Sequence, residues 1–196
     1  MPETDTVLQM GWWDWIGIIV AAVALLMAAP SFVQIILGRP KVIPQFDRHV
    51  EGVERVLLMF IKNPPITTHW LSRLYVRRDT VQSLTVTFRI AEVGSGRIII
   101  PVRQARIYSD DDPSYVGRYR TTLPPTYSVA ASVVFVAWDT EGSRATVPED
   151  GAYPRIYLDP GYYCAEIILT VDGKPIRVSR QFVVGAKADD LHWSPS

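Results

Sequence analysis

The sequence predicts a mainly β protein in which a single N-terminal transmembrane helix precedes one antiparallel β-sandwich. Residues 16–37 are an uncharged apolar run of about 22 residues, which as a helix can cross a hydrocarbon core roughly 30 Å thick. After this run, short apolar stretches alternate with polar positions and end at Pro- and Gly-rich turns, as is typical of strands. The hydrophobic content of 48% in 196 residues is sufficient for a packed core.

Composition excludes several classes of site. The 20 Lys and Arg residues balance 20 Asp and Glu residues, so the chain lacks a global field for nucleic acid. The one cysteine, Cys164, excludes an internal disulfide framework and a cysteine-based zinc cage. We therefore expect neither nucleic-acid binding nor a disulfide scaffold.

The expected organisation has five consecutive parts. They are an N-terminal tail (residues 1–15), the transmembrane helix (16–37), a juxtamembrane linker (38–52), the β-sandwich domain (53–184) and a flexible tail (185–196). A cleaved signal peptide is the alternative interpretation of the apolar run. It is disfavoured because the preceding residues are acidic and the apolar residues continue past Pro30 to Leu37.

The flanks of the span predict its anchors and its direction. Bulky aromatic and basic side chains next to a span sit at the membrane interface. The expected interface anchors are Trp12, Trp13, Trp15, Arg39 and Lys41. Lys and Arg near the span occur only behind it, so the N-terminus is expected outside and the β domain in the cytoplasm.

Small residues in the span fall at alternating offsets of 4 and 3, which places them on one helix face. They are Gly17, Ala21, Ala24, Ala28 and Ser31. Such a stripe lets two membrane helices approach closely, so it is a helix-packing face through which a homo-oligomer could form. The general abundance of alanine in apolar helices explains the same stripe without a partner.

The strands of the sandwich are predicted from apolar runs and their turns. Residues 53–61 predict a buried strand, with a short helix as the alternative. Residues 84–90 alternate with period 2, and after the turn at 94–96 residues 97–108 are expected to return as the paired strand. Pro101 places that strand at an edge or at a bulge. Residues 127–138 predict a central strand, and a long polar loop is expected over 139–151.

The C-terminal third contains the clearest hairpin. Alternating apolar residues precede and follow Asp172-Gly173, a strong hairpin turn signal. The stretch LDPGYYCAEIILTVDGKPIRVSRQFVV resembles the last hairpin of immunoglobulin-like and fibronectin-like sandwiches. Within it, Asp159, Gly161 and Tyr163 have the spacing of a tyrosine corner, in which the Tyr hydroxyl ties a loop to the strand. Ala165 stands where the immunoglobulin pattern has Cys. The resemblance implies an Ig-like architecture and carries no activity.

Candidate chemistry is sparse. The histidines His49, His69 and His192 lack a partner at metal-ligand spacing, so they are interpreted as solvated or loosely packed. The acidic loop Asp110–Asp112 could offer oxygens to a cation, but a solvated loop explains it as well. We expect no catalytic, metal or cofactor-binding residues, and therefore no enzyme and no cofactor.

Lys and Arg outnumber Asp and Glu between residues 39 and 106. A basic outer surface is predicted from Arg89, Arg97, Arg103 and Arg106, which could face anionic headgroups; an ordinary solvated face is the alternative. The expected partners are the lipid bilayer and a protein. Two functions follow: a tethered module that binds a protein partner, or a sensor in which ligand binding drives association of the membrane helices.

Overall fold

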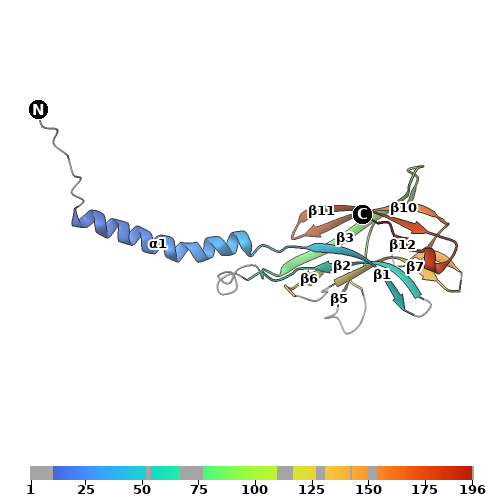
Figure 1. The fold of residues 1–196 in the computed structure, drawn as a ribbon, viewed down its shortest axis with the longest axis horizontal. Coiled ribbons are helices and arrows are strands. Elements are labelled where there is room, and N and C mark those ends of the chain that lie inside the picture. The colour runs from blue at the N-terminus through green and yellow to red at the C-terminus, as the bar shows by residue number, and fades with distance from the viewer. Residues whose placement is uncertain are drawn as a thin grey trace, which may run out of the picture. The chain divides into compact units, whose positions relative to one another are not determined.

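The computed structural model describes residues 11–51, 54–66, 77–109, 117–126, 131–141, 143–149 and 154–195. It divides into two compact units (Figure 1). The helical unit contains the apolar helix and residues up to Arg39, together with residues 66 and 77. The β unit contains the described residues of 40–65 and 78–195.

The helical unit is dominated by α1 (Trp12–Leu37), a helix of 26 residues. Asp14 caps its start, because a carboxylate oxygen accepts a hydrogen bond of 2.8 Å from the Gly11 amide, and the negative charge suits the helix N-terminus. At the other end the Gly38 amide donates to the Gln34 carbonyl oxygen at 2.8 Å. An apolar helix is therefore present and ends at Leu37, as predicted. It begins at Trp12 rather than at Ile16, so the end of the predicted N-terminal tail is helical.

The β unit consists of two antiparallel sheets. Sheet A has the order β1–β2–β7–β8–β9, with β5 also paired to β7. Its strands are β1 (Ile43–Glu51), β2 (Glu54–Lys62), β5 (Tyr108–Ser109), β7 (Ala131–Asp139), β8 (Arg144–Val147) and β9 (Ile156–Leu158). The predicted strands at 53–61 and 127–138 correspond to β2 and β7, and β7 is central. Residues 127–130 of the second prediction lie outside the described residues.

Sheet B has the order β12–β11–β10–β3–β4, with β6 also paired to β3. Its strands are β3 (Val81–Glu92), β4 (Ile98–Gln104), β6 (Thr121–Leu123), β10 (Gly161–Val171), β11 (Lys174–Val184) and β12 (His192–Trp193). The predicted hairpins are present. Asp172 and Gly173 have φ values of 48° and 81°, as the tight turn between β10 and β11 requires. Pro101 lies on the edge strand β4, as expected.

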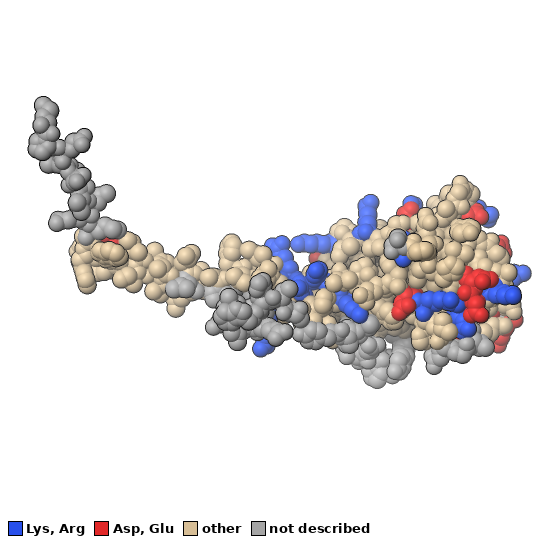
Figure 2. All heavy atoms as spheres, in the orientation of Figure 1, with Lys and Arg blue, Asp and Glu red and all other residues tan. Residues whose placement is uncertain are grey.

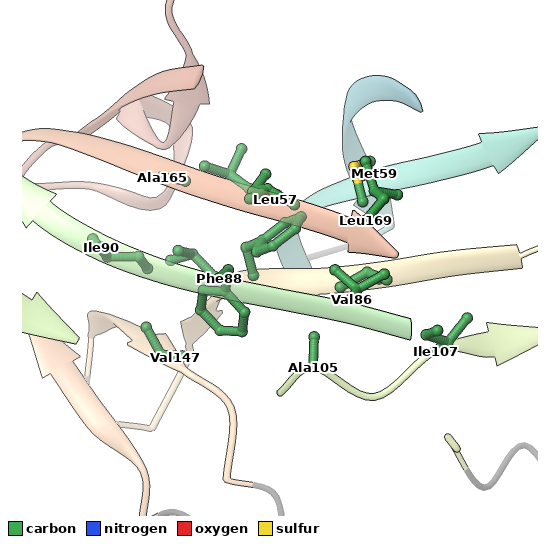
Figure 3. Packing of buried hydrophobic residues seen from close by; sticks show 14 of the residues in the cluster. Leu57, Met59, Val86, Phe88, Ile90, Ala105, Ile107, Val147, Ala165 and Leu169 are labelled. Carbon is green, nitrogen blue, oxygen red and sulfur yellow. The ribbon is translucent and has the colours of Figure 1, made fainter. Parts of the chain in front are cut away.

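The core lies between the two sheets (Figure 3). Alternate residues of β3 point into it, and Leu84, Val86 and Ile90 are fully buried. Phe88 from sheet B meets Phe135 from sheet A edge-to-face, with ring centroids 5.1 Å apart. The arrangement is therefore sandwich-like, as predicted.

Two expected loops are strands instead. The predicted linker 38–52 contains β1, which pairs with β2 along its whole length. Pro44 lies within β1 and is typical of a linker, but β1 is an edge strand, where a missing amide donor is tolerated. The predicted polar loop at 139–151 contains β8, whose Ala145 and Val147 are buried.

The predicted flexible tail at 185–196 is also structured where the structure describes it. It forms η1 (Ala188–Asp190) and β12, and Leu191 is fully buried. Trp193 contacts Phe46 and Phe135 of sheet A and Phe182 of sheet B, with centroids 4.9, 6.0 and 5.6 Å apart. This C-terminal segment therefore closes the space between the sheets. Isolated apolar residues between polar ones gave no periodic signal from which this could be predicted.

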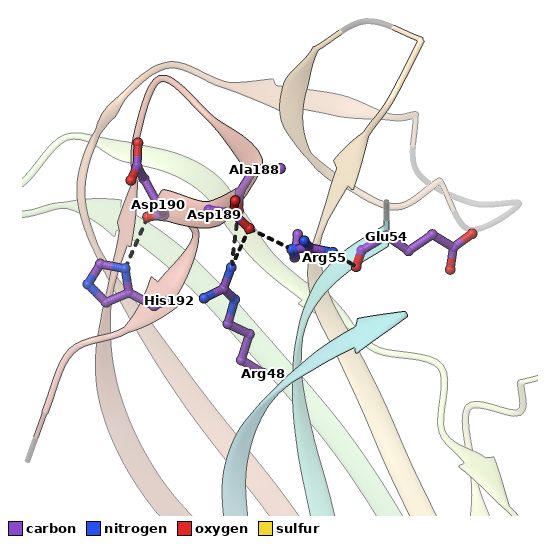
Figure 4. A network of polar contacts seen from close by, with 7 residues as sticks. All are labelled: Arg48, Glu54, Arg55, Ala188, Asp189, Asp190 and His192. Carbon is purple, nitrogen blue, oxygen red and sulfur yellow. Dashed lines mark hydrogen bonds and ion pairs between the residues drawn. The ribbon is translucent and has the colours of Figure 1, made fainter. Parts of the chain in front are cut away.

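An ion-pair cluster connects the same segment to sheet A (Figure 4). Asp189 accepts a hydrogen bond of 2.9 Å from Arg55 on β2 and lies 3.5 Å from the Arg48 guanidinium on β1. Arg48 also donates to the Ala188 carbonyl oxygen at 3.5 Å. Because Asp189 is 76% exposed, the charges contribute little, and the buried apolar contacts of Leu191 and Trp193 dominate.

Candidate functional site

A hollow lies on the outer face of sheet B. Strand alternation creates this face: Thr87 and Arg89 point away from the core because Val86 and Phe88 point into it. On β10, Glu166 and Ile168 alternate in the same way with buried neighbours. The hollow has a volume of about 510 Å³ and is lined by residues of β3, β4, β10 and β11. We call it the sheet B hollow.

A bidentate ion pair crosses the hollow. Arg89 and Glu166 stand directly opposite each other in the β3–β10 register. Arg89 donates from Nε to Oε2 at 2.6 Å and from Nη2 to Oε1 at 2.8 Å. These hydrogen bonds, followed by the charge of Arg89, hold the pKa of Glu166 below its ordinary value. The pair is held in one geometry although both side chains are substantially exposed.

Apolar side chains border this ion pair. Val102 on β4 lines the hollow and is 63% exposed, and Ile168 on β10 lines it from the other side. Ile98, on the same edge strand as Val102, is 55% exposed. Arg177 adds a positive charge from β11. The surface therefore combines exposed aliphatic groups with one fixed ion pair and one further cation.

The cysteine on this face contacts a hydroxyl group. Cys164 lies on the same outer face, and its Sγ contacts the Ser179 hydroxyl at 3.1 Å. The contact supplies no general base, which a nucleophilic thiol requires. In the part of the chain that the structure describes, no three His, Cys, Asp or Glu residues are grouped as metal ligands. The candidate cation loop Asp110–Asp112 and His69 lie outside the described residues.

The predicted basic surface is not assembled. Arg103 is only 4% exposed and its guanidinium lies 5.1 Å from the centroid of the Phe88 ring, on the core side of sheet B. Arg106 lies over Tyr119 at 5.8 Å. Arg89 is bound to Glu166, and Arg97 follows the turn before β4. The four arginines therefore do not share one outer face.

A β-bulge causes this difference. Phe88 pairs with Arg103 and Ile90 pairs with Ile100, so two residues of β4 oppose the single Arg89. The extra residue reverses the alternation, and both Ile100 and Arg103 become buried. Pro101 signalled an edge or a bulge, but a proline alone does not say which side chains change face.

The contact expected of a tyrosine corner is present. The Tyr163 hydroxyl donates a hydrogen bond of 2.7 Å to the Asp159 carbonyl oxygen. Gly161 lies between them, and a side chain added there would meet the Tyr163 ring at 3.5 Å. Burial raises the pKa of Tyr163, which keeps the hydroxyl protonated as this donation requires.

The side chains of α1 face outward. Trp12, Trp13 and Trp15 are 76, 80 and 54% exposed, and Arg39 and Lys41 are exposed as well. On the small-residue face, the described residues Gly17, Ala21, Ala24, Ala28 and Ser31 are all exposed. A side chain added at Gly17 would meet nothing within 4 Å.

A contact that the sequence did not predict lies at the C-terminal end of α1. The Gln34 side chain donates to the Arg77 carbonyl oxygen at 2.7 Å and accepts from the Arg77 amide at 3.1 Å. It thereby pairs with a backbone 43 positions later, as a neighbouring strand would. Gly38 makes room for it, because an added side chain would overlap the Gln34 amide nitrogen.

No protein-family model matches the chain, and no curated protein matches its sequence.

Proposed function

We propose that this protein is a single-pass membrane protein whose β unit, an immunoglobulin-like sandwich on the cytoplasmic side, binds a protein partner. The observation that carries the proposal is α1. Its most apolar stretch has no buried side chains, and Leu25 and Met27 are 73 and 77% exposed. Its described surface visible in Figure 2 is uncharged apart from acidic atoms at the N-terminal end. Such a surface needs an apolar solvent, which a bilayer supplies.

The strand order supports the immunoglobulin-like part of the proposal. Sheet B places β3 beside the final hairpin β10–β11, and sheet A places β2 beside β1 and β7. An immunoglobulin-like sandwich has the same neighbours when β10 and β11 are its last two strands. The Tyr163–Asp159 hydrogen bond at the start of β10 adds to this support.

The sheet B hollow supports the choice of a protein partner. Interfaces between proteins combine a desolvated apolar centre with polar groups that fix the register. Val102 and Ile168 supply apolar area in the hollow, while Arg89 and Glu166 supply fixed donors and acceptors. Ile98 adds exposed apolar area on the same edge strand as Val102. On the visible face of the β unit in Figure 2, basic and acidic groups both occur, which fits selective contacts better than a general attraction to polyanions.

Photo-crosslinking in cells tests this proposal. A photoreactive residue at Ile98 should give a discrete adduct with another protein, and adding Val102→Arg should reduce that adduct by at least about tenfold, since a charge would be buried at the contact. A photoreactive residue at Tyr157, 47% exposed on sheet A, is the control and should give none. Equal adducts from both positions, or none from Ile98, would contradict the proposed surface.

A further inference from the structure

The end of α1 brings together two basic segments that are far apart in the sequence. Arg39 lies one residue beyond Gly38, and its Nε donates to the Ile35 carbonyl oxygen at 3.2 Å. Gln34 binds the backbone of Arg77 through both the nitrogen and the oxygen of its side-chain amide. Two exposed arginines are therefore held within the helical unit at the same helix terminus.

The Gln34 contact positions the charge of Arg77 without occupying its side chain. Both hydrogen bonds use only the main-chain amide and carbonyl of Arg77. A glutamine in an otherwise apolar helix is costly unless its amide is paired, and here the pairing partner carries a cation. The chain continues with a further base near each arginine, Lys41 and Arg78.

We infer that Arg39 and Arg77 form a binding site for the phosphate of an anionic phospholipid at the C-terminal end of α1. A guanidinium binds a phosphate through paired hydrogen bonds, and cations are also favoured at a helix C-terminus. Arg39 and Arg77 lie at the end of an apolar helix, and the side chains of this helix would contact the acyl chains of the same lipid. The inference rests on the proposed membrane span and adds to it a selected lipid and a role for Gln34.

The test uses the full chain reconstituted in vesicles of phosphatidylcholine and phosphatidylglycerol in equal amounts. After purification in a mild detergent, mass spectrometry gives the ratio of the two lipids retained by the protein. We expect phosphatidylglycerol to be enriched over the bulk mixture. Arg39→Gln and Arg77→Gln should each lower the enrichment roughly fivefold. Arg144→Gln, which removes an exposed charge on β8, is the matched control and should leave it unchanged.

Gln34→Leu separates this site from a general effect of charge. It retains every basic residue and keeps the helix apolar, but it removes both hydrogen bonds to Arg77. We expect the enrichment to fall as in Arg77→Gln. Unchanged enrichment in Gln34→Leu, or none in the unmodified chain, would overturn the inference. Extraction of the chain from the vesicles by alkaline carbonate would instead overturn the membrane span, so the two failures are distinguishable.

Discussion

At the scale of single residues, one buried polar side chain connects distant parts of the β unit. Asn63 is fully buried and accepts a hydrogen bond of 3.1 Å from the Lys41 amide. Its amide nitrogen donates to the carbonyl oxygens of Asp79 and Leu123 at 3.0 and 3.2 Å. In the sequence, Asn63 simply follows the apolar run at 53–61. Its partners lie up to 60 positions away, which no local pattern can indicate.

Asn63→Leu should destabilise the β unit strongly. The substitution leaves one amide and two carbonyl groups without their partner, and an unsatisfied buried group costs about 1–3 kcal/mol. We expect the free energy of unfolding to fall by at least about 2 kcal/mol in denaturant titrations of the full chain in micelles. Gln45→Ala, at an exposed position of β1, should change it by less than about 0.5 kcal/mol. Similar values for both variants would contradict this role.

The ion pair of the sheet B hollow predicts a small dependence of stability on pH. Because the pKa of Glu166 is lowered in the folded chain, its contribution is present above the ordinary glutamate value of 4.5 and is lost as the pH falls through the folded value. The stability difference between the unmodified chain and Glu166→Gln should therefore shrink with acidification. Thermal unfolding at pH 7 and below pH 4.5 measures it. A stability difference that grows in acid would contradict this expectation.

At the scale of elements, the sequence predicted those that repeat a pattern and missed those that depend on distant contacts. Residues 84–90 alternate strictly, and β3 follows them. The C-terminal segment has no such period, because Leu191 and Trp193 stand between polar residues. Leu191 is nevertheless fully buried, and the ring of Trp193 contacts Phe46, Phe135 and Phe182 from three other strands. The face of each side chain on β4 was equally unpredictable, since it depends on the bulge opposite Arg89.

Variants of Trp193 measure how much the C-terminal segment contributes. The indole Nε1 donates to the Asp47 carbonyl oxygen at 2.8 Å, in addition to the ring contacts. Trp193→Phe keeps most of the packing and loses this hydrogen bond, so we expect a loss of about 1 kcal/mol in unfolding free energy. Trp193→Ala also loses the packing and should cost up to about 3 kcal/mol. Circular dichroism during denaturant titration provides both values. Equal losses in the two variants would show that the ring contacts contribute nothing.

At the scale of the whole molecule, the proposed function depends on the orientation of the span in the membrane as well as on the fold. An acidic residue, Asp14, lies in the first turn of α1, while Arg39 follows its end and Arg77 is hydrogen-bonded there through its backbone. The positive-inside rule counts the basic residues near the span in the sequence. Arg77 is distant in the sequence and lies near the end of the span only in the folded chain. The sheet B hollow was also only partly predictable, because it too depends on residues that folding brings together. Arg89 was recognised as outward-facing, but its pairing with Glu166 requires the order of the strands.

Protease protection tests the direction. With the β unit in the cytoplasm, protease added to intact cells should leave it undigested, and permeabilised cells should lose it. Arg39→Glu combined with Lys41→Glu removes the bases immediately behind the span and should increase the fraction that is digested from outside. Complete digestion of the unmodified chain in intact cells would contradict the proposed orientation.

The contact between Trp193 and the strand β1 also has a consequence for the rate of folding. Asp47 and Trp193 are 146 positions apart, so this contact requires closure of nearly the longest loop that the β unit contains. Topologies with such distant contacts fold in milliseconds to seconds rather than in microseconds. If the segment docks after the transition state, Trp193 variants will accelerate unfolding while leaving the refolding rate nearly unchanged. The last contact to form would then set the lifetime of the folded β unit.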